Sequence, residues 1–171
     1  MVKMSGKEWW KDEAPPEGYY FVEAKRGREF LIRMLSGADI VNTIQKFAKD
    51  HDIKIGKIHA AFMGGLQPAR YLVWAPDSKD PDNWAHEVVA ELHNLSMILS
   101  MSGIIQPNTR GGTDPVVKIH FVTGGGWDCP TVGGHLATGS LVKGICEVYI
   151  TELLGLEIIH KAGVEDWFNK V

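Results

Sequence analysis

The sequence has few cysteines, no long apolar run and no excess of positive charge. Its two cysteines, Cys129 and Cys146, are too few for a disulfide framework, and neither belongs to a Cys-x-x-Cys pair that would suggest zinc binding or redox chemistry. The 21 acidic side chains outnumber the 18 basic ones and leave a formal charge of -3. Dedicated nucleic-acid binders usually carry a basic surface, so the global charge argues against DNA.

The amino terminus lacks a targeting signal. Residues 1–16 contain no continuous apolar stretch of the kind found in a signal peptide, and nowhere do about 18 apolar residues run together, as a membrane helix requires. We therefore expect a cytoplasmic protein without a membrane partner. The low cysteine content also fits a reducing compartment.

A chain of 171 residues, of which 44% are apolar, has the size and composition of one domain. Residues 1–18 are polar and carry Trp9-Trp10 and Pro15-Pro16, a pattern that predicts an irregular arm. Residues 19–160 are predicted to form the domain, and residues 161–171 a C-terminal tail.

Short apolar bursts near the start of the domain predict a hairpin followed by a helix. Residues 20–22 and 30–32 read as two strands, with the charged segment 25–29 as the turn between them. Ser36-Gly37-Ala38-Asp39 then offers a capping box at the start of a helix. After it, five apolar residues recur at helical spacing: Ile40, Val41, Ile44, Phe47 and Ala48.

The rest of the chain reads mainly as strands. Segments 53–62 and 69–74 are predicted as strands broken at Gly64-Gly65, where a bulge or tight bend is expected. Residues 84–92 have the spacing of a helical stripe, whereas residues 95–101 alternate with the period of a strand. Further strands are predicted at 116–122, 132–138 and 145–153. The predicted fold class is α+β, a mainly antiparallel sheet packed on one principal helix.

Two histidines carry the strongest local inference. If the strands on either side of the loop 123–130 form a hairpin without a bulge, His120 lies directly opposite His135, and Phe121 opposite Gly134. Directly opposed residues have β-carbons roughly 4.5 to 5.5 Å apart, close enough for two imidazoles to share a metal ion or a ligand atom. We therefore predict a histidine-lined site on one face of the hairpin.

A transition metal such as zinc needs at least a third protein ligand. The sequence offers His93, Glu91, His59 or a residue from a neighbouring subunit, and spacing fixes none of them. Of these candidates we predict His93 as the third metal ligand, together with His120 and His135. The alternative is that the two histidines satisfy hydrogen bonds or line a subunit interface.

Two other motifs are weaker. Gly124-Gly125-Gly126 lacks the Gly-Lys-Ser/Thr ending of a phosphate-binding loop, and a wide hairpin turn explains it equally well. Arg26-Gly27-Arg28 is similar to the core of an AT-hook, which lays arginines in the minor groove of DNA. Here Glu29 follows, and its charge would repel phosphates, which favours a solvated turn.

Several motifs between about Phe30 and Leu153 occur in the same order as in the domain conserved in plants and prokaryotes, called the PPC domain, and the sequence resembles that family. The most specific parts are Ser100-Met101-Ser102-Gly103, Val117-Lys118-Ile119-His120 and Gly133-Gly134-His135-Leu136. The family often has a second histidine where this chain has Lys118. The resemblance implies a fold with an antiparallel sheet that assembles as a homotrimer.

Three functions follow from these observations. The favoured one is a homotrimeric binding or regulatory module with a metal or small-molecule site. The second is a DNA-associated transcriptional regulator, which the plant members of the family imply and which would need a basic patch. The third is a metal-dependent hydrolase or lyase with Glu91 or Asp128 as general base. The residues available for the basic patch are Lys25, Arg26, Arg28, Arg70 and Arg110.

Overall fold

The structure is a computed structural model that describes residues 22–76, 86–109, 111–127, 130–159 and 167–170. Within these residues the chain forms one helix and a series of strands. In chain order they are β1 (Lys25–Leu35), α2 (Ile40–Asp50), β2 (Gly56–Leu66), β3 (Ala69–Ala75), β4 (His86–Leu92), β5 (Ser96–Gln106), β6 (Val116–Gly124), β7 (Val132–Leu136), β8 (Val142–Leu154), β9 (Leu156–Ile159) and β10 (Trp167–Lys170).

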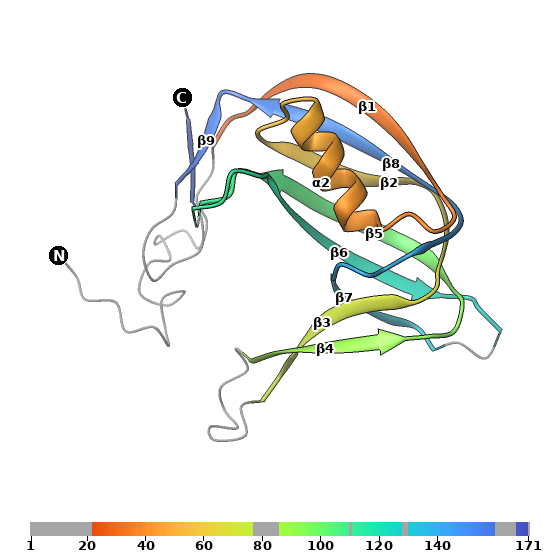
Figure 1. Cartoon of the computed structure of the whole chain (residues 1–171). Coiled ribbons are helices and arrows are strands. Elements are labelled where there is room, and N and C mark those ends of the chain that lie inside the picture. Colours follow the sequence, from red (N-terminus) through yellow and green to blue (C-terminus); the bar gives the residue numbers. More distant parts are fainter. Residues whose placement is uncertain (1–21, 77–85, 110, 128–129, 160–166, 171) are drawn as a thin grey trace.

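Strands β1 to β8 form one sheet in the order β1-β8-β2-β5-β6-β7-β3-β4, and every neighbouring pair is antiparallel. The sheet curls around α2, which lies on its inner face (Figure 1). The predicted class, an antiparallel sheet packed on one principal helix, is confirmed for the described residues. We call the opposite side of the sheet the outer face.

Strands β9 and β10 pair as a separate two-stranded sheet. Strand β10 therefore lies within residues 161–171, which the sequence assigns to a tail. The predicted arm, residues 1–18, lies outside the described residues. The described part of the chain contains no helix with the length and hydropathy that crossing a membrane requires.

Helix α2 carries the predicted apolar stripe, but it begins three residues later than a capping box headed by Ser36 would place it. Asp39 is its N-cap, and one carboxylate oxygen accepts a hydrogen bond from the backbone N–H of Asn42 at 3.0 Å. Such a cap satisfies a backbone donor that the first turn leaves unpaired. The other oxygen accepts from the N–H of Gly139 at 2.6 Å. Asp39 therefore both starts the helix and ties it to the segment before β8.

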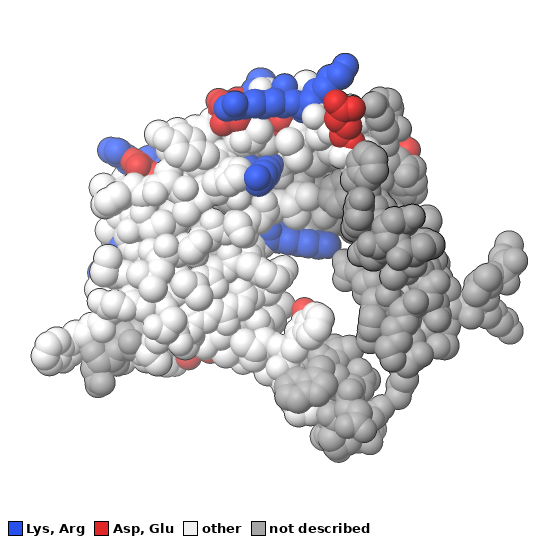
Figure 2. All heavy atoms as spheres, turned by 180° about the vertical axis from the view of Figure 1, so that it is seen from behind, with Lys and Arg blue, Asp and Glu red and all other residues white. Residues whose placement is uncertain are grey.

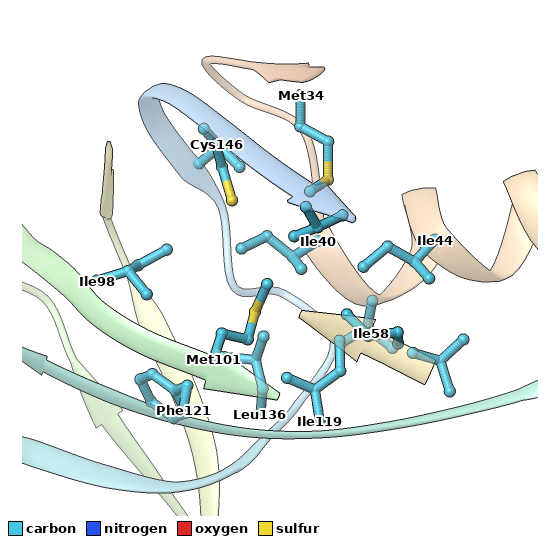
Figure 3. Close-up of a cluster of buried hydrophobic side chains, with 14 of the residues drawn as sticks. Met34, Ile40, Ile44, Ile58, Ile98, Met101, Ile119, Phe121, Leu136 and Cys146 are labelled. Carbon is cyan, nitrogen blue, oxygen red and sulfur yellow. The ribbon is translucent and has the colours of Figure 1, made fainter. Parts of the chain in front are cut away.

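The apolar face of α2 packs on alternate residues of the sheet. Ile40 and Ile44 are fully buried on the helix, and Ile58, Ile119 and Ile150 are fully buried on three of the strands. Figure 3 shows several of these side chains converging between the helix and the sheet. Because side chains alternate along a strand, the neighbouring residues of each strand point to the outer face.

The predicted hairpin around residues 25–29 is wrong. These residues belong to one continuous strand, β1, which is bulged between Arg26 and Glu29. The charged run is compatible with a strand because Arg28 pairs with Glu152 of the adjacent β8. A bulge accommodates an extra residue in a strand without ending it.

Two further expectations are corrected. Residues 86–92 of the predicted helical stripe form β4, which pairs with β3 and so has a period of two. Strand β2 also does not end at Gly64-Gly65, although its register does shift there, as expected for a bulge. A β-carbon on Gly64 would lie 2.2 Å from the carbonyl oxygen of Ile145, so glycine is what lets β2 approach β8 at this position.

Candidate functional site

The predicted register of the histidine hairpin is confirmed. His120 on β6 pairs with His135 on β7, and Phe121 pairs with Gly134. The two imidazole ring centroids are 5.4 Å apart, with the rings tilted by 75°. Because Phe121 is buried on the inner face, the two imidazoles lie together on the outer face.

Glycines allow β7 to fit between β6 and β3. A β-carbon on Gly133 would lie 2.6 Å from the carbonyl oxygen of Phe121, and one on Gly134 would lie 2.6 Å from that of Leu72. Both distances are shorter than any real contact of this kind, so a larger residue would force the strands apart. The Gly133-Gly134 pair therefore positions His135 in the sheet.

A pocket of about 880 Å³ opens on the outer face over the histidine pair. It spans strands β4, β3, β7, β6 and β5. Its floor contains His120, His135 and Ser102, and its charged groups are Lys118 and Glu87. Trp74, which is 70% exposed, also lines the pocket. The other lining residues are Leu72, Val73, Gly103, Ile104 and Gly134.

The pocket lowers the pKa of His135. Partial burial is the main cause, since it disfavours the charged imidazolium, and the nearby His120 and Lys118 act in the same direction. The carboxylate of Glu87 opposes the shift. His135 is therefore neutral at physiological pH, the form in which an imidazole nitrogen can bind a metal ion or accept a hydrogen bond.

His93, the third ligand adopted from the sequence, does not line this pocket. Its side chain is 81% exposed and contacts Glu91, with 3.1 Å between Nδ1 and Oε1. Glu91 also lies 3.1 Å from Nε of Arg70, and it does not line the pocket either. His59 lines a different groove, on strands β1, β8 and β2. Asp128 lies outside the described residues.

Among the described residues, no three His, Cys, Asp or Glu side chains lie close enough to hold a metal ion. One copy of the chain therefore supplies two imidazoles, which is fewer than the three protein ligands of a typical zinc site. The carboxylate that sequence reasoning missed is Glu87, which faces the pocket from β4 opposite Trp74. The helical interpretation of residues 84–92 concealed the position of Glu87. In a strand, alternate residues share a face, so Glu87 and Val89 lie on the same side of β4.

The described residues thus form a small α+β domain with a histidine pair on the outer face of its sheet. The sequence model of the Plants and Prokaryotes Conserved (PCC) domain matches residues 21–154. The chain belongs to this family, as the resemblance predicted. No curated protein matches the sequence significantly.

Solved structures share the fold over almost the whole chain. A plant- and prokaryote-conserved protein from Pyrococcus horikoshii matches with a TM-score of 0.69 and 19% identity, covering 90% of this chain and 99% of that one. A metal-containing protein from Archaeoglobus fulgidus matches with a TM-score of 0.65 and 26% identity, with the same coverage. A protein from Bacteroides thetaiotaomicron, proposed to bind DNA, has a TM-score of 0.63 and 14% identity over 86% of this chain and 97% of that one.

Proposed function

We propose that the chain is a homotrimeric binding module whose histidine-lined pocket takes a divalent transition metal such as zinc, or a small organic ligand. The observation that carries this proposal is the pairing of His120 with His135 on the floor of an 880 Å³ pocket. A pocket of this volume has the size of a small-molecule site. The metal-containing relative from Archaeoglobus fulgidus supports the metal form of the proposal.

Metal binding requires a third ligand in addition to the two imidazoles. The pocket opens on the outer face, where a second copy of the chain could contribute a side chain across an interface. Glu87 is the carboxylate that already lies on the pocket wall. A metal would thus join the histidine pair to Glu87, after a local movement, or to a residue of a neighbouring subunit.

The character of the outer face supports self-association. Figure 2 shows uncharged atoms over much of this face, with charged side chains gathered mainly along the edge where Figure 1 places β1 and β8. Large apolar side chains are exposed on the part of it that carries the histidine pocket, including Val89 and Trp74. Monomers seldom expose apolar patches larger than a few hundred Å², which favours an interface here.

The DNA alternative has less support. Of the basic residues that the sequence offered, Arg26, Arg28 and Arg70 each lie within 3.1 Å of a carboxylate, on Glu29, Glu152 and Glu91 respectively. Paired arginines leave little positive charge for phosphates. Arg110 lies outside the described residues. The relative proposed to bind DNA has 14% identity, a level that carries the fold and no residue of a DNA site.

Native mass spectrometry of protein purified without an affinity tag tests both parts of the proposal. We expect a trimer that binds about one zinc ion per subunit when zinc is supplied. His135→Ala is expected to abolish zinc binding while the protein stays folded, because its side chain lies off the buried face. His93→Ala is the matched control and should bind zinc like the wild type.

A monomer at micromolar concentration would overturn the trimer. Zinc binding that survives in His135→Ala but is lost in His93→Ala would move the metal away from the pocket. Unchanged zinc binding in both variants would contradict the metal site at His120 and His135.

A further inference from the structure

We propose that the outer face carries a second, independent ligand site, in which Lys57, His59 and Tyr149 bind the acidic group of a small organic anion. The site is a groove of about 590 Å³ on the adjacent strands β1, β8 and β2. We call it the Lys57 groove. Its lining residues are Ala24, Arg26, Glu29, Lys57, His59, Tyr149, Thr151 and Leu153.

The strand register places these side chains on a regular grid. Lys57 is opposite Thr151, which in turn is opposite Glu29, and His59 is opposite Tyr149. Directly opposed side chains in an antiparallel sheet lie on the same face, with β-carbons roughly 4.5 to 5.5 Å apart. The ammonium group, the imidazole and the phenol therefore project together from two neighbouring strands.

The carboxylate in the groove is already neutralised. Glu29 accepts a hydrogen bond from Nε of Arg26 at 2.8 Å. The Thr151 hydroxyl and Arg26 both stabilise the ionised form and hold the pKa of Glu29 below its ordinary value. The negative charge of Glu29 is thus paired with Arg26, so Glu29 repels an incoming anion only weakly.

Lys57 is left with a positive charge that no acidic side chain of the described residues pairs with in a salt bridge. The groove's side chains carry two permanent cations, Lys57 and Arg26, against one carboxylate. The surplus positive charge lies at Lys57, in the groove that Tyr149, a residue 46% exposed, also lines. A cation close to the hydrogen-bond donors of His59 and Tyr149 suits an oxyanion.

The remaining walls of the groove are apolar. Leu153 lies opposite Arg26, two residues beyond Thr151 on the same face of β8, and Ala24 precedes β1. Together with the ring of Tyr149 they offer a surface for a flat or aliphatic body. The ligand class that fits is a small carboxylate or phosphate monoester with an apolar part. Its acidic group would contact Lys57, and its apolar part would lie on the apolar walls, since small-molecule sites are typically apolar with a few polar groups that orient the ligand.

The Lys57 groove is separate from the histidine pocket and does not depend on the function proposed for it. His59 and His120 both pair with Ser102 of β5, from opposite sides, so one strand separates the two sites. Neighbouring strands lie about 4.8 Å apart, which puts His59 and His120 roughly 10 Å apart along the sheet. No residue lines both sites.

The test is a titration of the full-length protein with phenyl phosphate and with benzoate, followed by the backbone amide resonances. Phenol, which has the same ring without the charge, is the ligand control. We expect saturable shifts centred on Lys57, His59, Tyr149 and Thr151 with either anion and none with phenol. Lys57→Gln is expected to weaken binding about tenfold through loss of the charge-assisted hydrogen bond.

Lys54→Gln is the matched protein control, since Lys54 is an exposed lysine that lines no part of the groove and pairs with Asp52. It should bind both anions like the wild type. The variant His120→Ala/His135→Ala should also retain binding, which separates this site from the histidine pocket. Equal binding by wild type and Lys57→Gln, binding of phenol, or an absence of shifts up to about 10 mM ligand would each overturn the proposal.

Discussion

The carboxylate of Glu152 on β8 receives three hydrogen bonds from Arg28 on β1. The backbone N–H donates at 3.2 Å, Nε at 2.8 Å and an Nη group at 2.7 Å. The same Nη group of Arg28 also donates a hydrogen bond to the carbonyl oxygen of His51 at the end of α2. One arginine thus connects the edge strand, its neighbour and the helix.

Arg28→Gln should make the stability of the protein less dependent on pH in the acid range. Arg28 lowers the pKa of Glu152 through its hydrogen bonds. A carboxyl group whose pKa is lower in the folded state adds stability above its unfolded pKa and loses it as the pH falls through the folded pKa. The wild type should therefore lose more stability than Arg28→Gln between about pH 6 and pH 3.

Urea unfolding at several pH values measures this difference. Glu152→Gln, which removes the titrating group itself, should show the same flattened profile as Arg28→Gln. Parallel profiles for the wild type and both variants would show that the contact contributes nothing to the acid transition.

Substitutions at the histidine pocket should move the pKa of His135 in opposite directions. Lys118→Met removes a positive charge and should raise it, whereas Glu87→Gln removes a negative charge and should lower it. In the wild type the pKa of His135 should lie below that of a free histidine. Titration of the imidazole carbon-bound protons by NMR gives all three values, and shifts of the same sign in both variants would contradict the charge arrangement.

The pKa of His135 also predicts how stability depends on pH near neutrality. Because the folded pKa is lowered, the unfolded chain takes up the proton first, and the native state loses stability as the pH falls below about 6.5. His135→Asn should remove this part of the loss. Thermal unfolding at about pH 7.5 and pH 5.5 in a non-metal-binding buffer would detect it.

Gly133→Ala should destabilise the sheet at the histidine hairpin. The added methyl group would meet the carbonyl oxygen of Phe121 at 2.6 Å. Overpacking of this kind typically costs about 1–3 kcal/mol. We expect a lower melting temperature together with altered His120 and His135 resonances. The neighbouring Val132→Ala is a control, since it shortens a half-buried side chain and adds no clash, and it should leave those resonances almost unchanged.

Ile44→Ala on α2 should reduce the free energy of unfolding by about 2–5 kcal/mol, because it leaves a cavity in the fully buried core. Asn42→Ala on the exposed side of the same helix should change it by less than about 0.5 kcal/mol. Chemical denaturation of both variants measures the difference. Similar losses for the two would mean that α2 is not held by its apolar face.

Cys146 should be unreactive in the native protein. Its side chain is buried in the core, and burial raises the pKa of the thiol to about 12, so almost no thiolate is present at neutral pH. In a Cys129→Ser background, labelling with a thiol reagent should proceed only as fast as the protein unfolds. Rapid labelling without denaturant would contradict the placement of Cys146.

Local sequence patterns predicted the features that depend on neighbouring residues. The pairing of His120 with His135 follows from the length of the loop between two strands, and helix α2 follows from the helical spacing of its apolar residues, such as Ile40 and Ile44. These features need no knowledge of the rest of the fold. The helix and the histidine pair were therefore accessible from the sequence.

Features that depend on distant strands were not accessible. Arg28 looks like part of a turn until Glu152 is seen beside it, 124 residues later in the chain. Glu87 and Lys57 acquire their roles only when β4 and β2 take their places in the sheet. His93 was adopted as a third ligand although its spacing from the histidine pair fixed nothing, and its side chain contacts Glu91 and does not line the pocket. The trimer and the metal stay predictions.

The position of β1 has a consequence for synthesis of the chain on the ribosome. β1 is among the first described segments to be made, yet its partner in the sheet is β8, which begins at Val142. The cap of α2 likewise waits for Gly139. Because domains are made from the amino terminus and long-range strand pairing is slow, the nascent chain carries β1 unpaired until β8 has been made. Translation pauses before residue 142 should therefore increase its dependence on chaperones.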